Sequence, residues 1–103
     1  MADADLPLRA RWRDLVGRRL PEEAKRRPDW PIRLDHCFAR VLLDCAHGRA
    51  WREVVVPPAW RNTDPETLAR AVALGESVLA GEIALPPLNA RSLALRGKRA
   101  ARG

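Results

Sequence analysis

The fourteen residues "DHCFARVLLDCAHG", numbered 35–48, decide the fold of this chain. Apolar side chains recur there at alternating intervals of three and four residues, which is the spacing of one face of an α-helix. Asp35 is placed to cap the helix by accepting amide hydrogens of the first turn, and Gly48 is the residue type that ends a helix in a left-handed conformation. The stretch therefore predicts a helix whose buried stripe consists of Leu34, Cys37, Phe38, Val41, Leu42 and Cys45.

One helix is expected before this one in the chain and a short one after it. Residues 8–19 repeat apolar side chains at the same spacing, and Pro21 is expected to end that helix because proline lacks the amide hydrogen that the helix needs. The segment 21–31, "PEEAKRRPDWP", then forms a polar connector bounded by prolines. Residues 49–55 are expected to form a short helix, in preference to a strand at 54–56, before the turn at Pro57 and Pro58.

The segment 63–81 predicts a third long helix. Thr63 and Glu66 have the spacing of a capping box, in which each side chain bonds an amide of the first turn. Gly75 lies in the middle of the buried stripe, where glycine costs about 1 kcal/mol relative to alanine. Close approach of another helix is the expected compensation. A last short helix is expected to begin near Pro87.

The predicted fold class is all-α. With 103 residues the chain is long enough for one domain with one core. We expect a small bundle of four to five helices with proline-rich turns and a disordered basic C-terminal tail. The expected divisions are a basic N-terminal helix and connector over 1–28, a compact helical domain over 29–96 and the tail over 97–103, which has no apolar side chain larger than alanine.

Positive charge is concentrated at the two ends of the chain. The net charge of +6 divides into +3 over residues 1–33, −2 over 34–90 and +5 over 91–103. Of the 19 basic residues, only Lys25 and Lys98 are lysines. Arginine binds phosphate and carboxylate in a bidentate manner and stacks on flat rings, which favours an anionic partner, although GC-rich coding sequences produce the same bias.

Several classes of protein are disfavoured. The chain has no run of about 18 apolar residues, which a membrane-spanning helix needs, and its first residues lack the apolar centre of a secretory signal. Two cysteines without an export signal indicate reduced thiols, so we expect a cytoplasmic protein. No glycine-rich phosphate loop, HExxH pattern, GxSxG elbow or zinc-finger spacing occurs.

The histidines and cysteines of the quoted stretch raise the question of a metal site. Cys37 and Cys45 are eight residues apart, which is about 12 Å along a continuous helix. One zinc ion cannot reach both sulfurs, because zinc–sulfur bonds are about 2.3 Å long. His36 and His47 lie further apart still. We therefore expect no metal and no cofactor, and we interpret both cysteines as small core residues.

The polar side of the same helix carries four chemically capable residues. His36, Arg40, Asp44 and His47 follow one another at intervals of four, four and three, so they form a row opposite Phe38. Arg40 and Asp44 have the spacing of an ion pair, and Asp44 can reach His47. The row is either a solvated set of salt bridges or a site that meets an anionic ligand.

Tryptophan is the remaining signal, since Trp12, Trp30, Trp51 and Trp60 are four of the five aromatic residues. Trp12, Trp51 and Trp60 each adjoin an arginine in the sequence. Arginine and indole together form a surface on which unpaired bases stack, worth about 1–3 kcal/mol per base. A small helical core also needs large side chains, so at least two of the four are expected to be structural.

The runs "WPIRLDHCFARVLLDCAHGRAWREVVVPPAWRN", "LARAVALGESVLAGE" and "LNARSLALRGK" resemble a group of short, largely uncharacterised microbial proteins over residues 30–98. Proteins of this group are sometimes labelled acetyltransferase-related. The chain has no glycine-rich loop beside a central sheet, so the resemblance implies a compact domain with a tail and no particular activity. The matching positions are Asp35, His36, Cys37, Phe38, Arg40, Asp44, Gly48, Trp51, Pro58, Asn89, Ser92, Leu93 and Arg96.

Three functions are compatible with these features. The first, which the charge favours, is binding of DNA or RNA. The second is a protein-interaction adaptor, which predicts an exposed apolar patch near Trp12 or Trp30. The third and least favoured is a small enzyme that uses the row of four polar residues, which predicts a concave pocket over that row. If the protein binds DNA or RNA, the residues expected to contact phosphate are Arg26, Arg27, Arg96, Lys98 and Arg99.

Overall fold

The structure is a computed structural model, and it describes residues 2–97, with side chains from Pro7 onward. Helices make up all the regular structure of this range. No strand occurs in this range, which confirms the predicted all-α class. None of its helices is both long enough and apolar enough to cross a lipid bilayer. The elements are α1 (Ala2–Asp14), η1 (Leu15–Arg19), α2 (Leu20–Ala24), α3 (Asp35–His47), η2 (Trp51–Glu53), α4 (Ala59–Asn62), α5 (Pro65–Leu79) and α6 (Leu85–Leu95).

The first three elements form one continuous rod, so the prediction that Pro21 ends the first helix is wrong. The chain stays helical to Ala24 because η1 is a π-helical turn, in which the amide of Leu20 bonds the carbonyl of Leu15, five residues earlier. In a regular α-helix the ring of Pro21 would clash with the carbonyl four residues before it. The wider π turn relieves that clash, and Pro21 then occupies the first turn of α2.

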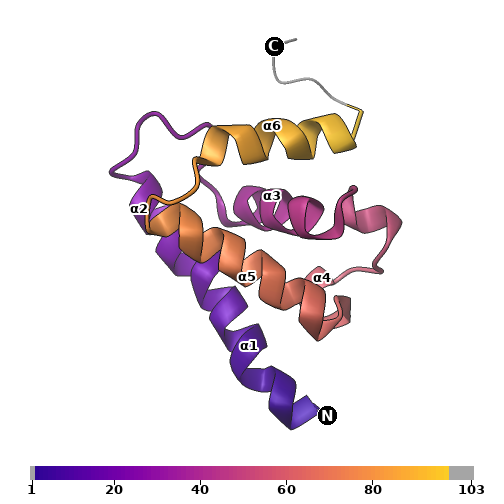
Figure 1. The fold of residues 1–103 in the computed structure, drawn as a ribbon. Helices are drawn as coiled ribbons and strands as arrows, with labels where there is room; N and C mark the ends of the chain where they lie inside the picture. The colour runs from indigo at the N-terminus through magenta and orange to yellow at the C-terminus, as the bar shows by residue number, and fades with distance from the viewer. Residues whose placement is uncertain (1, 98–103) are drawn as a thin grey trace.

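The rod and α5 run side by side in the same direction (Figure 1). Gly75 of α5 lies where the two meet, as predicted: a Cβ atom on it would be 2.6 Å from Cδ2 of Leu15 and 3.0 Å from Cδ1 of Leu42. Arg11 binds both carboxylate oxygens of Glu76 at 3.1 Å on the surface of the same contact. Glycine thus lets three helices approach at one point.

Helix α3 matches the predicted helix, with Gly48 ending it in the left-handed region at φ 78°. Its N-cap is Leu34 rather than Asp35, because the carbonyl of Leu34 already accepts from the amides of Cys37 and Phe38. Asp35 is the first helical residue, and its carboxylate accepts from the amide of His36 at 2.7 Å. The expected buried stripe holds at Phe38, Val41 and Leu42, while both cysteines are half-buried and Leu34 is exposed.

Two other predicted boundaries are corrected. The helix expected over 49–55 is a single 3₁₀ turn, η2, after which the chain passes through a cis Pro57–Pro58 bond into α4. Helix α6 starts at Leu85 rather than near Pro87, because both following prolines fit its first turn, where no amide hydrogen is needed.

The expectation of a disordered tail concerns 97–103, of which 98–103 lie outside the described residues.

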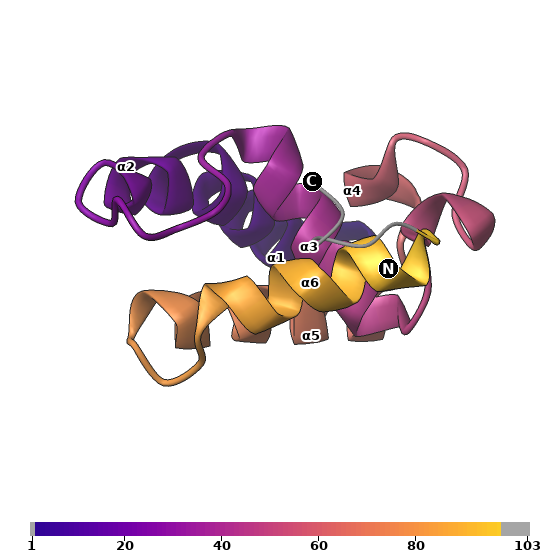
Figure 2. The same ribbon diagram turned by 90° about the horizontal axis from the view of Figure 1, so that it is seen from above.

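The helices form three layers, with α3 in the middle (Figures 1 and 2). On one side α3 packs on α5 and on the N-terminal rod, and on the other side it carries α6. Large side chains of the rod, among them Trp12, Leu15 and Leu20, belong to the same buried cluster as Phe38 and Leu68. The bundle therefore has one core, and α6 covers a face of α3 that the other long helices leave open.

Candidate functional site

Asp44 of α3 is fully buried where α3 meets α6, and its carboxylate organises the polar contacts there. Oδ2 accepts from the Ser92 hydroxyl and from Nε of Arg96, both at 2.6 Å, and Oδ1 accepts from Nη2 of Arg96 at 3.1 Å. The amide of Trp51 donates to Oδ1 at 2.9 Å. A buried carboxylate without such donors would be very costly, and bidentate pairing with a guanidinium is among the strongest compensations.

Arg40, one turn earlier on α3, belongs to the same network. Its Nη1 donates to the Ser92 hydroxyl and its Nη2 to Oδ1 of Asn89, both at 2.8 Å. Both acceptors are neutral, so these bonds hold the guanidinium in place without cancelling its charge. A guanidinium has five N–H donors, and these two bonds leave others for a ligand.

Arg40, Arg96 and Trp51 of this network border a concavity of about 320 Å³, which we call the cationic pocket. Three guanidinium groups converge on it, from α3, from η2 and from Arg96 at the C-cap of α6. Asp44 neutralises that of Arg96, which leaves the charges of Arg40 and Arg52. The guanidinium of Arg52 lies over the indole of Trp51, 5.4 Å from the ring centroid. None of the described residues that line the pocket is acidic. The lining consists of His36, Ala39, Arg40, Trp51, Arg52 and Arg96.

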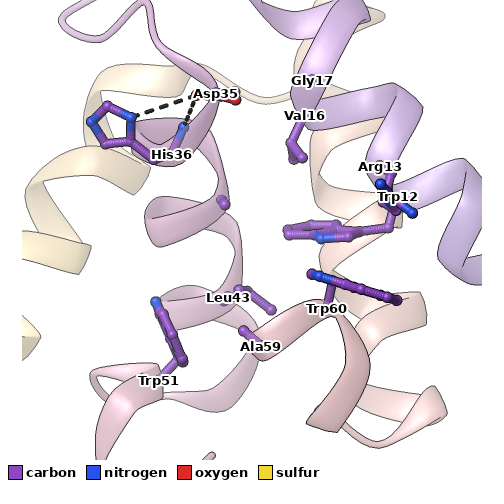
Figure 3. A pocket seen from close by; sticks show the side chains of 11 residues that line it. Trp12, Arg13, Val16, Gly17, Asp35, His36, Leu43, Trp51, Ala59 and Trp60 are labelled. Atoms are coloured by element: carbon purple, nitrogen blue, oxygen red, sulfur yellow. Dashed lines mark hydrogen bonds and ion pairs between the residues drawn. The ribbon is translucent and has the colours of Figure 1, made fainter. Parts of the chain in front are cut away.

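A second concavity of about 420 Å³ lies next to the first, and we call it the tryptophan pocket. Figure 3 shows the indoles of Trp12 and Trp60 on one side of it and the indole of Trp51 on the other. Arg13 lies over the ring of Trp60, 4.9 Å from its centroid. The two pockets share Trp51, His36 and Ala39 as lining residues, so Trp51 forms a wall common to both.

No protein-family model, curated protein or solved structure matches this chain. The two pockets are therefore interpreted from their own chemistry. That chemistry is cationic on one side of Trp51 and aromatic on the other.

The predicted row of polar residues is divided between buried and exposed environments, which corrects the expectation of one solvated face. His36 is exposed, its ring lies on the side of α6 (Figure 3), and it belongs to the lining of both pockets. Asp44 is buried, and its cationic partner is Arg96 rather than the predicted Arg40. His47 is half-buried, outside the lining of both pockets, and burial lowers its pKa. Of the four residues in the row, His36 and Arg40 line the cationic pocket, whereas Asp44 and His47 do not.

The arginines predicted to contact phosphate lie in different places. Arg26 and Arg27 follow α2, where both are paired with Glu23, at 3.5 Å and 2.9 Å. Arg27 also covers the ring of Trp30 at 5.3 Å. Arg96 lies at the cationic pocket with its side chain 23% exposed. Lys98 and Arg99 are outside the described residues.

Sequence reasoning missed Asn89, Ser92 and Arg52 as parts of the site. Asn89 and Ser92 are spaced by three and four residues with Arg96, which is the signature of one polar helix face. Arg52 adjoins Trp51 in the sequence, which marks it as a partner of that indole but does not indicate that it meets Arg40 and Arg96. Six positions that carry the resemblance meet in this one network: Arg40, Asp44, Trp51, Asn89, Ser92 and Arg96.

The cysteines do not form a site with the histidines. Cys37 and Cys45 are both free thiols, and burial raises the pKa of Cys45, which keeps it in the poorly nucleophilic thiol form. The sulfur of Cys45 donates to the carbonyl of Leu88 at 3.5 Å. Within residues 2–97, no group of three or more histidine, cysteine or acidic side chains is arranged to hold a metal ion.

Neither Trp12 nor Trp30 is itself part of an exposed apolar patch of the kind expected for an adaptor. Both indoles are buried, and Trp30 packs edge-on against Phe38 with ring centroids 5.7 Å apart. This confirms that at least two tryptophans are structural. The exposed large hydrophobic side chains among the described residues are Leu34, Val54 and Val56.

Proposed function

We propose that the protein binds nucleic acid and that the cationic pocket holds a backbone phosphate. The observation that carries this proposal is the convergence of three guanidinium groups from three separate elements on one concave surface, with one internal carboxylate against them. Arginine presents paired donors that match the oxygens of a phosphate group. Neutralising phosphates with such groups releases counterions, which is the main source of affinity in this class of complex.

The rigidity of Arg40 supports the same proposal. Ser92 and Asn89 fix both terminal nitrogens of its guanidinium, and Ser92 is in turn fixed by Asp44. A preorganised donor loses little conformational freedom when it binds, so more of its interaction energy appears as affinity. The Arg40 charge also has no acidic partner in these bonds, as expected for a group that meets an anion.

Arg26 and Arg27 provide a further cationic surface after α2. Arg26 is 78% exposed and its 3.5 Å pair with Glu23 is a weak, solvated one, so its charge is accessible to a long strand. Lys98 and Arg99 remain proposed contacts on sequence grounds. The enzyme alternative has less support, because the hydroxyl of the network, Ser92, is fully buried and already bonded to Asp44.

The test measures fluorescence anisotropy of labelled DNA and RNA oligonucleotides across a salt series. Affinity is expected to fall steeply with salt, and the variant Arg52→Gln is expected to reduce the slope of log K against log salt by about 1. Arg70→Gln is the matched control, because it removes the same charge from an exposed arginine of α5 outside both pockets. Absence of binding at about 50 mM salt, or equal effects of the two variants, contradicts the proposal.

A further inference from the structure

We infer that the ligand is single-stranded and that one unpaired base enters the tryptophan pocket while its neighbouring phosphate occupies the cationic pocket. This inference rests on the proposed function and adds the strand type and the position of a base. It follows from the arrangement of the two pockets, which share the wall formed by Trp51.

The charges of the two pockets differ in the way that a nucleotide requires. The lining of the cationic pocket carries three guanidiniums, whereas that of the tryptophan pocket carries three indoles with one cation, Arg13, and one anion, Asp35. These two charges offset each other in the tryptophan pocket, so a phosphate is attracted more strongly to the cationic pocket on the other side of Trp51. A neutral, flat base suits the aromatic side.

The size and the accessibility of the tryptophan pocket also fit a base. Its volume of about 420 Å³ is within the range of small-ligand sites, roughly 300–1,000 Å³. Trp12 is buried in its lining, while Trp51 and Trp60 line the cavity as half-buried side chains (Figure 3). Stacking on indoles does not depend on base identity, so weak sequence preference is expected.

A duplex cannot use this pocket without losing a base pair. A paired base is stacked between its neighbours, and moving it out costs the energy of unstacking and unpairing. An unpaired base does not incur the cost of breaking a pair. Duplex nucleic acid is therefore left with phosphate contacts alone, whereas a single strand adds the tryptophan pocket.

The experiment compares a labelled 12-nucleotide strand with the duplex of the same sequence, using the full chain. Wild-type protein is expected to bind the single strand about tenfold more tightly. Trp60→Leu is expected to weaken single-strand binding about tenfold and to leave duplex binding unchanged. Trp60→Phe, which keeps an aromatic face, is expected to retain most of the affinity. Circular dichroism checks that each variant is folded, and the wild-type comparison holds even if Trp60→Leu does not fold.

A competition arm tests whether base and phosphate are bound together. Excess nucleoside monophosphate is expected to displace the strand at a concentration at least about tenfold lower than inorganic phosphate, because it fills both pockets. Equal potency of the two competitors overturns the inference, as does equal affinity for strand and duplex or an equal loss of both in Trp60→Leu. In those cases the proposed function stands, since phosphate binding persists. Absence of binding to either oligonucleotide overturns both.

Discussion

At the scale of single residues, His47 shows how position on a helix decides protonation. Its ring is half-buried near the end of α3, and Nε2 is buried without a hydrogen-bond partner among the described residues. Burial lowers the pKa of His47 below its ordinary value of 6.5, because the charged imidazolium is poorly solvated there; Asp64 and Asp44 act in the opposite direction. The neutral ring is therefore favoured in the folded protein.

Stability is expected to fall when the pH is lowered through the range below 6.5. In this range the unfolded chain binds a proton that the folded His47 does not yet accept, so the free energy of unfolding decreases as the pH falls towards the folded pKa. Urea unfolding at several pH values measures the effect. His47→Gln is expected to reduce this dependence, whereas His36→Gln, a change at an exposed ring, is expected to preserve it. Identical pH profiles for wild type and His47→Gln would contradict the assignment.

At the scale of elements, the start of α5 depends on one aspartate rather than on the predicted capping box. Asp64 is the N-cap, and its carboxylate accepts from the amide of Thr67 at 2.9 Å. That hydrogen bond lowers the pKa of Asp64. Thr63, the predicted cap, is buried with its hydroxyl unpaired among the described contacts. Both residues are common N-caps, and the sequence alone placed the boundary one residue too early.

Two substitutions separate these roles by thermal or urea unfolding. Asp64→Ala is expected to reduce the free energy of unfolding by about 1 kcal/mol, because it removes the capping bond. Thr63→Val keeps the shape of the side chain and removes a buried, unpaired hydroxyl, so it is expected to leave stability unchanged or to raise it by up to about 1 kcal/mol. A larger loss in Thr63→Val than in Asp64→Ala would restore Thr63 as the cap.

At the scale of the whole molecule, α6 is attached mainly to α3. Its buried positions are Leu85, Asn89 and Ser92, of which two are polar. The attachment therefore depends on the Asp44 network as well as on apolar burial. The same network fixes Arg40 and Arg96, so the contact that holds α6 in place also shapes the cationic pocket.

Asp44→Ala is expected to lower the free energy of unfolding by about 3 kcal/mol or more, because it leaves the Arg96 guanidinium and the Ser92 hydroxyl without their acceptor. Arg96→Ala is expected to act in the same direction, and the double variant is expected to lose less than the two single losses added together. Denaturant unfolding measures all three.

The matched control is Asp14→Ala, which breaks a solvent-exposed pair with Arg18 and is expected to change the free energy of unfolding far less than Asp44→Ala does. Equal losses in Asp14→Ala and Asp44→Ala would show that the buried network does not stabilise the bundle.

The sequence by itself determined the all-α class, the central helix and its glycine end, and the close approach at Gly75. Each of these depends on local spacing or on the conformational freedom of one residue, and both can be read along the chain. The helix continuing through Pro21 could not be predicted, since it depends on a π turn that no local pattern requires.

Only the tertiary structure decided the site. Asp44 is 48 residues from Ser92 and 52 from Arg96, so nothing near Asp44 in the chain indicates that it is buried and paired with α6. The two pockets likewise join residues from α1, η1, α3, η2 and α4 with Arg96 at the C-cap of α6. Local periodicity fixes which face of a helix is apolar, but the partner of a polar side chain depends on how the helices pack, and packing sums contacts across the whole chain.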